Sequence, residues 1–316
     1  MAVLGGAGAM GRAVVFDLAQ QGAHVRLIET DLARARAIAR RYGQGRAEVV
    51  GLAPGDAEAL AAAVQGADVL VNCGPYGLNL IAMDAALSAR SHYLDLGGLF
   101  HTTRRQLARD AEFRRAGRLA VVGMGSAPGT TNVLARWAAK RFTRVEAIRV
   151  YNGGADFTPG RGPLSFGFSP ATLLDELSQR PMVFTKGRFR SAPPLSGGED
   201  FRFDLGTQRV HRSLHSEVAT LPLSFAGAGI RECAFKIAYE PAFVERMRFL
   251  IDLGLADPRP GPRGVAPRDV LLDALRALPP GPEIVDDRDA LAVVVEGRDR
   301  RGPVTVRVEL TARPQR

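Results

Sequence analysis

The fold of this chain is decided by residues 3–29, which read VLGGAGAMGRAVVFDLAQQGAHVRLIE. The apolar pair at its start is typical of the end of a short β-strand. Residues 6–11, GAGAMG, fit the pattern G-x-G-x-x-G, and a helical pattern over 12–21 follows at once. A second apolar run, 23–28, ends in Glu29. This order of strand, glycine turn, helix, strand and acidic residue predicts a βαβ unit.

Such a unit indicates a dinucleotide site more than a bare structural turn. One glycine permits the tight turn, a second lets the backbone approach a pyrophosphate, and a third allows close helix–strand packing. The N–H groups at the helix N-terminus then face the phosphates. Glu29 lies 18 residues after Gly11, where a carboxylate can accept both ribose hydroxyls and would repel a 2′-phosphate. NAD is therefore favoured over NADP, although Arg34 and Arg36 weaken this preference. The predicted cofactor contacts here are Gly6, Gly8, Ala9, Met10, Gly11, Glu29 and Thr30.

Composition is that of an ordinary globular protein. The chain has 316 residues, enough for two domains, with 46% hydrophobic and 24% charged residues. No apolar run reaches membrane-spanning length, and we expect no signal peptide. Two cysteines, Cys73 and Cys233, are too few for a disulfide framework, so a reducing cytoplasm is expected.

The net charge of +9 would suit a nucleic-acid partner, but two features oppose that interpretation. The arginines are spread along the chain rather than packed into one block, and aromatic residues make up only 7%. A solvated, arginine-rich surface with a modest attraction for anionic ligands explains the charge. We therefore expect no nucleic-acid partner, no membrane association and a small-molecule substrate.

Strands and helices alternate up to about residue 141, which predicts a doubly wound parallel sheet in a domain over 1–125. Ligands bind where the strands of such a sheet end. Two strand ends carry polar or glycine-rich loops, 73–77 and 95–98. We expect both loops to face the nicotinamide half of the cofactor. One helix is predicted over 103–116.

A second domain, 126–316, is predicted to be α+β and to serve substrate binding and dimerisation. A strand over 145–151 is expected to turn at Asn152-Gly153-Gly154, and 182–210 shows short alternating strands typical of an antiparallel sheet. Helices are predicted over 170–177, 241–255 and 270–278, and a hairpin over 290–310. The terminal segment, about 245–316, could pack back on the first domain.

Three stretches resemble the saccharopine dehydrogenase family: CGPY at 73–76, YLDLGG at 93–98 and GSAPG at 125–129. Further similarity includes Phe168-Ser169-Pro170 and FLIDLG at 249–254, and within the family the chain is most similar to L-lysine 6-dehydrogenases. The resemblance implies a Rossmann domain with an α+β domain, NAD(P)-dependent oxidation of a C–N bond of an amino acid, and a homodimer. One departure is Ala127, where relatives often have Asp. A saccharopine-type dehydrogenase and a non-catalytic NAD(P)-binding paralogue remain alternatives.

Oxidation of an amine needs a base for the ammonium proton, and few residues can supply it. Asp95 could attract the ammonium, or it could hydrogen-bond loop N–H groups. Tyr76 could line the pocket or pack as an ordinary aromatic side chain. His215 is a candidate base and Arg212 a candidate clamp for a carboxylate, although their stretch also resembles an exposed polar turn.

The remaining candidates in the predicted site have less specific roles. Lys236 and Gly97 are expected on the substrate, with a solvent-facing strand position as the alternative for Lys236. Cys73, Gly74 and Pro75 are expected against the cofactor, where Cys73 forms a wall of the pocket. No histidine or cysteine spacing indicates a metal site.

Overall fold

The computed structural model describes residues 1–52, 55–158, 169–278 and 286–313. The chain divides into two compact units, Met1–Gly129 and Thr130–Arg316. The division falls close to the boundary expected between residues 125 and 126. Phe168, one of the residues that carry the family resemblance, lies outside the described residues.

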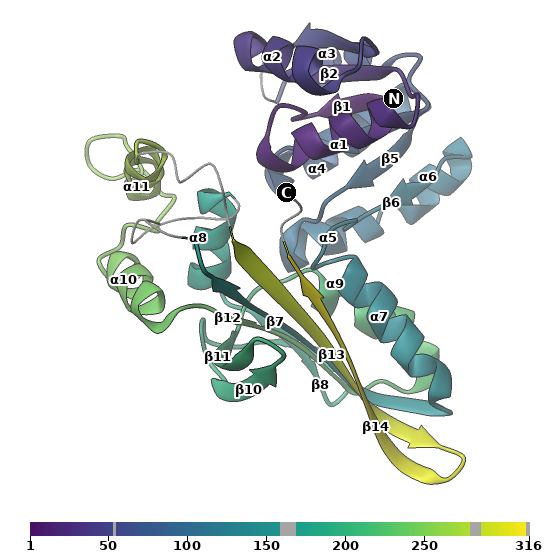
Figure 1. The fold of residues 1–316 in the computed structure, drawn as a ribbon, viewed down its shortest axis with the longest axis vertical. Helices are drawn as coiled ribbons and strands as arrows, with labels where there is room; N and C mark the ends of the chain where they lie inside the picture. The colour runs from purple at the N-terminus through teal and green to yellow at the C-terminus, as the bar shows by residue number, and fades with distance from the viewer. Residues whose placement is uncertain (53–54, 159–168, 279–285, 314–316) are drawn as a thin grey trace. The chain divides into compact units, whose positions relative to one another are not determined.

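The first unit is built on a six-stranded parallel sheet with the order β3-β2-β1-β4-β5-β6 (Figure 1). Every neighbouring pair of its strands is parallel. This is the order of the doubly wound dinucleotide fold, so the predicted fold class is confirmed. The strands are β1 (Ala2–Leu4), β2 (Val25–Glu29), β3 (Ala47–Gly51), β4 (Val69–Asn72), β5 (His92–Asp95) and β6 (Ala120–Val121).

Local capping explains where two helices of this unit begin. The carboxylates of Asp31 and Asp56 accept the backbone N–H of Arg34 and Ala59, at 3.0 and 2.9 Å. The single helix expected over 103–116 is wrong, because it breaks into two at Arg109. The helices are α1 (Ala9–Gln20), α2 (Leu32–Tyr42), α3 (Ala57–Val64), α4 (Asn79–Ser88), α5 (Leu99–Leu107) and α6 (Asp110–Ala116).

At that break, the Arg109 side chain is directed to α4 rather than to solvent. Its Nη2 atom lies 2.6 Å from Asp84 and its Nη1 atom donates to the Leu80 carbonyl at 3.3 Å. The same guanidinium also pairs with Glu112. These contacts tie the start of α6 to α4 and explain why the helix changes direction there.

Apolar side chains cover both faces of the first sheet. Val15 of α1 packs with Leu27 in one buried cluster, and Met83 of α4 packs with Leu70 in another. Successive strand residues point to opposite faces, so a strand buried on both sides reads as a continuous apolar run. The core therefore fixes the strand ends where the glycine loop and the 73–77 loop lie.

The second unit is built on an eight-stranded sheet that is mixed, not wholly antiparallel as expected. Its main path is β10-β11-β12-β7-β13-β14, with β8 and β9 attached beside β12. β12 runs parallel to β7, and the other pairs are antiparallel. The strands are β7 (Arg144–Asp156), β8 (Met182–Thr185), β9 (Arg188–Ser191), β10 (Glu199–Phe203), β11 (Gly206–Arg212), β12 (Glu232–Ala238), β13 (Asp287–Asp299) and β14 (Gly302–Ala312).

The turn expected at Asn152-Gly153-Gly154 is wrong, because β7 continues through it to Asp156. Gly153 pairs with Ala290 in the sheet. A Cβ atom on Gly153 would lie 2.7 Å from a ring carbon of Phe203. The glycine is therefore needed to seat an aromatic ring against the strand, not to reverse the chain.

The helices of the second unit are α7 (Thr130–Ala138), α8 (Pro170–Ser178), α9 (Glu217–Ser224), α10 (Pro241–Asp252) and α11 (Pro267–Arg276). The sequence did not predict α9, which contains Pro222 and is buried. The predicted terminal hairpin is present as β13 and β14, the long pair drawn in yellow in Figure 1. α8, α10 and α11 share one apolar cluster around Leu174 and Met247.

Candidate active site

The glycine loop of the first unit has no room for a side chain at two of its positions. A Cβ atom on Gly11 would lie 2.1 Å from the Gly5 carbonyl oxygen, and one on Gly6 would lie 2.8 Å from Leu27. The tight turn itself falls on Gly5, whose φ is +75°, and not on the first glycine of the pattern. Gly5 was not predicted from the sequence, although the doubled glycine at 5 and 6 was an available signal.

Glu29, at the end of β2, is held by the loop that precedes α1. Its Oε1 atom accepts the N–H of Ala7 at 2.8 Å, and its Oε2 atom accepts the N–H of Thr30 at 3.2 Å. A carboxylate has about four lone-pair sites, so acceptor capacity remains for ribose hydroxyls. The glycine cradle and this half-buried carboxylate fit the predicted dinucleotide.

We expect Glu29→Gln to reduce the preference for NAD over NADP by about tenfold, roughly 1.4 kcal/mol. Gln keeps the oxygen that accepts from Ala7 but loses the charge that repels a 2′-phosphate. Dissociation constants for both cofactors measure the effect. Glu48→Gln is the matched control, because Glu48 is an exposed carboxylate on β3. An unchanged preference in Glu29→Gln would contradict the role of Glu29.

The loop after β4 packs directly against the glycine loop. A Cβ atom on Gly5 would lie 2.8 Å from the backbone nitrogen of Gly74, and the Asn72 side chain accepts the Gly74 N–H at 3.0 Å. Burial raises the pKa of Cys73 to about 12, so its thiol stays protonated and suits a wall rather than a nucleophile. Tyr76 is half-buried in the short 3₁₀ turn Tyr76–Leu78, and its role stays a prediction.

Asp95 is fully buried at the end of β5, and four donors already use its carboxylate. Oδ1 accepts the N–H groups of Gly97 and Gly123 at 2.9 and 2.8 Å, while Oδ2 accepts from Tyr93 and Gln106 at 2.9 and 2.5 Å. This arrangement fits the loop-bonding alternative better than a catalytic role. Gly97, with φ of +129°, is part of the loop that Asp95 holds.

We expect Asp95→Asn to lower the free energy of unfolding by about 2 kcal/mol. The amide NH₂ of Asn would face two donors where the carboxylate now has an accepting oxygen. Denaturant unfolding measures the loss, and Asp68→Asn, at an exposed position before β4, serves as the control. Equal stability of the two variants would argue against a structural role for Asp95.

His215 and Glu217 form a buried pair at the start of α9. The Nδ1 atom of His215 is hydrogen-bonded to Oε2 of Glu217, whose Oε1 accepts the Thr131 hydroxyl at 2.8 Å. The His215 ring stacks on Phe235 with centroids 3.8 Å apart. Glu217 is fully buried, whereas 9% of the His215 side chain is exposed. A carboxylate on one ring nitrogen orients the imidazole and leaves the other nitrogen for proton transfer.

A further buried carboxylate, Glu176 of α8, faces this pair. Burial raises its pKa to about 7, against the opposing effects of the His215 charge and the Tyr239 hydroxyl, which donates to Oε2 at 3.2 Å. Burial lowers the pKa of His215, but the charge and hydrogen bond of Glu217 and the charge of Glu176 outweigh it and raise the pKa. Glu176 therefore titrates near neutral pH, and its charge acts on His215.

Arg212 and His215, three residues apart in the sequence, do not form one cluster. His215 stacks on Phe235, whereas Arg212 pairs in register with Lys236, the next residue of β12. Adjacent strand residues point to opposite faces, so the two candidates lie on opposite sides of β12. Arg212 and Lys236 instead line a common cavity of about 320 Å³. The alternative of an exposed polar turn is wrong, because this stretch runs from β11 into the largely buried helix α9.

The sequence did not predict that Glu217, Glu176 and Tyr239 belong to the buried cluster. Glu217 had a signal, because it lies two residues after His215. Glu176 had a weaker one, an acidic pair inside the apolar run Leu173–Leu177. Tyr239 had none, since its hydrogen bond to Glu176 joins residues that lie 63 positions apart in the sequence.

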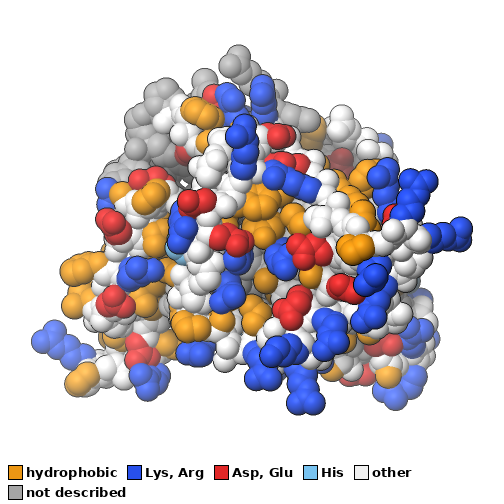
Figure 2. All heavy atoms as spheres, turned by 90° about the horizontal axis from the view of Figure 1, so that it is seen from below, with side chains coloured by type: hydrophobic (Ala, Val, Ile, Leu, Met, Phe, Trp, Pro, Cys, Tyr) orange, Lys and Arg blue, Asp and Glu red, His pale blue; other side chains and the backbone are white. Residues whose placement is uncertain are grey.

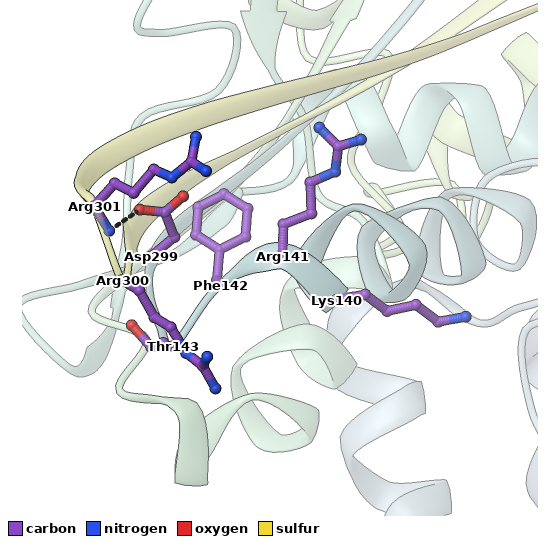
Figure 3. Close-up of a pocket in the computed structure, with 7 residues that line it drawn as sticks. All are labelled: Lys140, Arg141, Phe142, Thr143, Asp299, Arg300 and Arg301. Carbon is purple, nitrogen blue, oxygen red and sulfur yellow. Dashed lines mark hydrogen bonds between the residues drawn. The ribbon is translucent and has the colours of Figure 1, made fainter.

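A second cavity, of about 450 Å³, lies beside the tip of the terminal hairpin and contains none of the predicted residues. Figure 3 shows that its basic side chains, Lys140, Arg141, Arg300 and Arg301, point away from one another. The Arg301 N–H donates to Asp299 at 2.7 Å, as in an ordinary hairpin turn. The side chains therefore lack the convergence that a binding site needs.

The face of the molecule seen from below in Figure 1 has the scattered charge that the sequence indicated. On the face drawn in Figure 2, Lys and Arg side chains are interspersed with Asp and Glu. Within the described ranges, no helix has the length and hydropathy to cross a membrane. Among the described residues, no group of three or more His, Cys, Asp or Glu side chains could hold a metal ion.

Comparison with known proteins identifies the first unit. Residues 1–121 match the model of the saccharopine dehydrogenase NADP binding domain. The chain is 25% identical over 201 residues to a carboxyaminopropylagmatine dehydrogenase of Synechocystis sp., covering 60% of this chain and 49% of that protein. It is 25% identical over 207 residues to a carboxynorspermidine synthase of Vibrio alginolyticus, covering 61% and 48%. The matched part thus spans about half the length of these relatives.

The whole chain shares its fold with a solved structure, apo saccharopine dehydrogenase (L-Glu forming) from Saccharomyces cerevisiae. The TM-score is 0.68 at 14% identity, covering 99% of this chain and 84% of that one. The predicted NAD(P) cofactor is confirmed by the match of the first unit. The likeness to L-lysine 6-dehydrogenase stays a prediction. Residues 1–121 are thus similar to a saccharopine dehydrogenase NADP binding domain, and the resemblance of the chain to the saccharopine dehydrogenase family is confirmed.

Proposed function

We propose that this protein is an NAD(P)-dependent oxidoreductase that oxidises a C–N bond of an amino acid, with lysine 6-dehydrogenase-like deamination as the first candidate. The observation that carries the proposal is the glycine loop with Glu29 in a domain that matches a dehydrogenase family. The family resemblance supports the C–N bond as the reacting group. The oriented histidine of the second unit supports proton transfer.

The chemistry divides between cofactor and side chains. The glycine loop and Glu29 would hold the nicotinamide cofactor, which would supply the acceptor for a hydride from the carbon that carries the amine. His215 accepts a proton from the substrate ammonium, so that the nitrogen lone pair forms the C=N bond as the hydride leaves. Glu217 keeps the ring oriented and stabilises its charged form. Water then adds to the imine, and ammonia leaves with formation of the aldehyde.

The relatives favour a second candidate. Their names describe a carboxylated norspermidine and a carboxylated aminopropylagmatine, which suggests a secondary amine carrying a carboxyl group as the substrate class. A saccharopine-type substrate and a cofactor-binding paralogue without turnover are the remaining alternatives. Ala127 gives the paralogue its support, because relatives often have a carboxylate there.

The test is reduction of NAD and NADP, followed by nicotinamide absorbance, with lysine, ornithine, saccharopine and carboxynorspermidine. Reduction with lysine alone would support the first candidate. Turnover with carboxynorspermidine or saccharopine alone would replace lysine by that substrate. Tight cofactor binding without reduction by any of the four amines would overturn the proposed activity and favour the paralogue.

We further propose a homodimer in a reducing compartment. β10 and β14 end the strand path of the second sheet, and sheet edges are commonly protected by pairing. Cys73 and Cys233 are both free thiols, which suits the cytoplasm. Sedimentation equilibrium tests the dimer, and a monomer at micromolar concentration would contradict it.

A further inference from the structure

The cavity between β7, β8, β11 and β12 combines charges in a way that the proposed reaction does not explain. Three cations, Arg149, Arg212 and Lys236, line it together with two carboxylates, Glu199 and Glu232. All belong to the second unit. The lining therefore carries one cation in excess of its carboxylates.

Two of the cations already have carboxylate partners. The Nζ atom of Lys236 lies 2.9 Å from Glu199 and donates to the Gly197 carbonyl at 2.8 Å. The Nη1 atom of Arg149 lies 2.5 Å from Glu296. Their charges are thus largely balanced by neighbouring protein groups.

Glu232, the remaining carboxylate of the lining, is satisfied by neutral donors. Its Oε1 atom accepts the Thr185 hydroxyl at 3.0 Å and the Lys186 backbone N–H at 2.9 Å. It therefore neutralises neither of the paired cations. Arg212 is thus the cation of this lining that forms no ion pair among the described residues.

Arg212 is the cation whose guanidinium is not satisfied. Its Nε atom is buried and, among the described residues, has no hydrogen-bond partner. A buried donor without an acceptor lowers the stability of the fold, unless a ligand or a water molecule accepts its hydrogen bond. The guanidinium also lies close against Gly197, because a Cβ atom on Gly197 would lie 2.7 Å from its central carbon.

We propose that this cavity binds one carboxylate group of a small-molecule ligand, with Arg212 as a two-pronged donor. Guanidinium and carboxylate match as parallel hydrogen-bond pairs, and a cavity of about 320 Å³ has room for a small carboxylic acid. Among the described residues that line the cavity, Arg212 is the cation without a carboxylate partner, so the cavity selects a single carboxylate rather than a pair. Its place on the face of β12 opposite His215 makes the proposal independent of the proposed base.

Ligand-observed NMR with propionate tests the proposal, with n-propylamine as the probe of equal size and opposite charge. The wild-type chain is expected to bind propionate, and glutarate with an affinity within about threefold, but not n-propylamine. Arg212→Gln is expected to weaken propionate binding at least tenfold, and Arg212→Lys less, because charge remains without the fork. Arg209→Gln, an exposed position on the same strand, is expected to change nothing.

Unchanged propionate binding in a folded Arg212→Gln variant, checked by its melting temperature, would overturn the proposal, as would the absence of propionate binding to the wild type. Glutarate binding more than tenfold tighter than propionate would overturn the selection of a single carboxylate. If lysine competes with propionate, the natural ligand of the cavity is an amino acid. If the two bind independently, the natural ligand is another carboxylic acid. Either result supports the cavity as a carboxylate site. Because binding is measured without turnover, these results stand whether or not the proposed reaction occurs.

Discussion

Gly11→Ala should abolish measurable cofactor binding, with a loss of at least 100-fold for both NAD and NADP. The added Cβ atom would lie 2.1 Å from the Gly5 carbonyl oxygen and 2.7 Å from the Gly6 Cα atom. Both contacts are with backbone, so no side chain can move aside to relieve them. The first turn of α1 must then shift away from the loop whose N–H groups would hold the pyrophosphate.

Fluorescence titration with each reduced cofactor measures this loss. Gly227→Ala is the matched control, because the structure leaves open space around Gly227 and its φ is not positive. A melting temperature for Gly11→Ala separates loss of the site from loss of the fold. Cofactor binding within threefold of wild type would show that the loop does not carry the dinucleotide.

His215→Asn should lower kcat by roughly 100-fold to 10,000-fold, the range for loss of a general base. Asn cannot accept the substrate proton at neutral pH, and the cofactor site in the other unit is untouched. Initial rates with the substrate found by the reduction assay measure the effect. Glu245→Gln, an exposed carboxylate on α10, is the control. Unaltered kcat would remove His215 from the mechanism.

The pH profile separates the base from the residue that positions it. Only neutral His215 accepts a proton, so the oxidative rate should rise with pH through its raised pKa. Glu217→Gln removes the charge that raises this pKa and leaves burial, which lowers it. The rising limb should therefore move to lower pH, and kcat should fall by about 100-fold. A profile that keeps its position would contradict the positioning role of Glu217.

The pair of His215 and Glu217 also makes the free energy of unfolding depend on pH, and the raised pKa of His215 determines the direction of that dependence. The folded pKa of His215 is raised, so the pair contributes fully to the free energy of unfolding below the unfolded value of about 6.5. The contribution is lost as pH rises through the folded pKa. Glu176, whose pKa is about 7, titrates in the same window, and the measured curve belongs to the cluster.

The first unit could be predicted from the sequence because its signals are local. A glycine turn, an acidic residue after the second strand, and Asp31 and Asp56 at helix starts each constrain their own segment. Because strands and helices alternate, the common topology that fits these segments is the doubly wound parallel sheet. Gly5 was missed because two adjacent glycines offered the same turn, and only packing against Gly74 distinguishes them.

The second unit resisted prediction because its decisive contacts are distant in sequence. Gly153 looks like a turn residue until Phe203 is placed against it. Arg212 and His215 look like neighbours until the alternation of β12 assigns them to opposite faces. The family resemblance supplied the expected chemistry of the chain, but it carried no information about these contacts.

The hydrogen bond from Thr131 to Glu217 has a consequence for how the buried pair responds to the rest of the chain. Thr131 lies in the first turn of α7, two residues after the point where the two units divide. That hydroxyl donates to the carboxylate of Glu217, and Glu217 in turn raises the pKa of His215. Any displacement of the first turn of α7 away from α9 therefore weakens this support. The acidity of the imidazole thus becomes a reporter of backbone position at the start of α7.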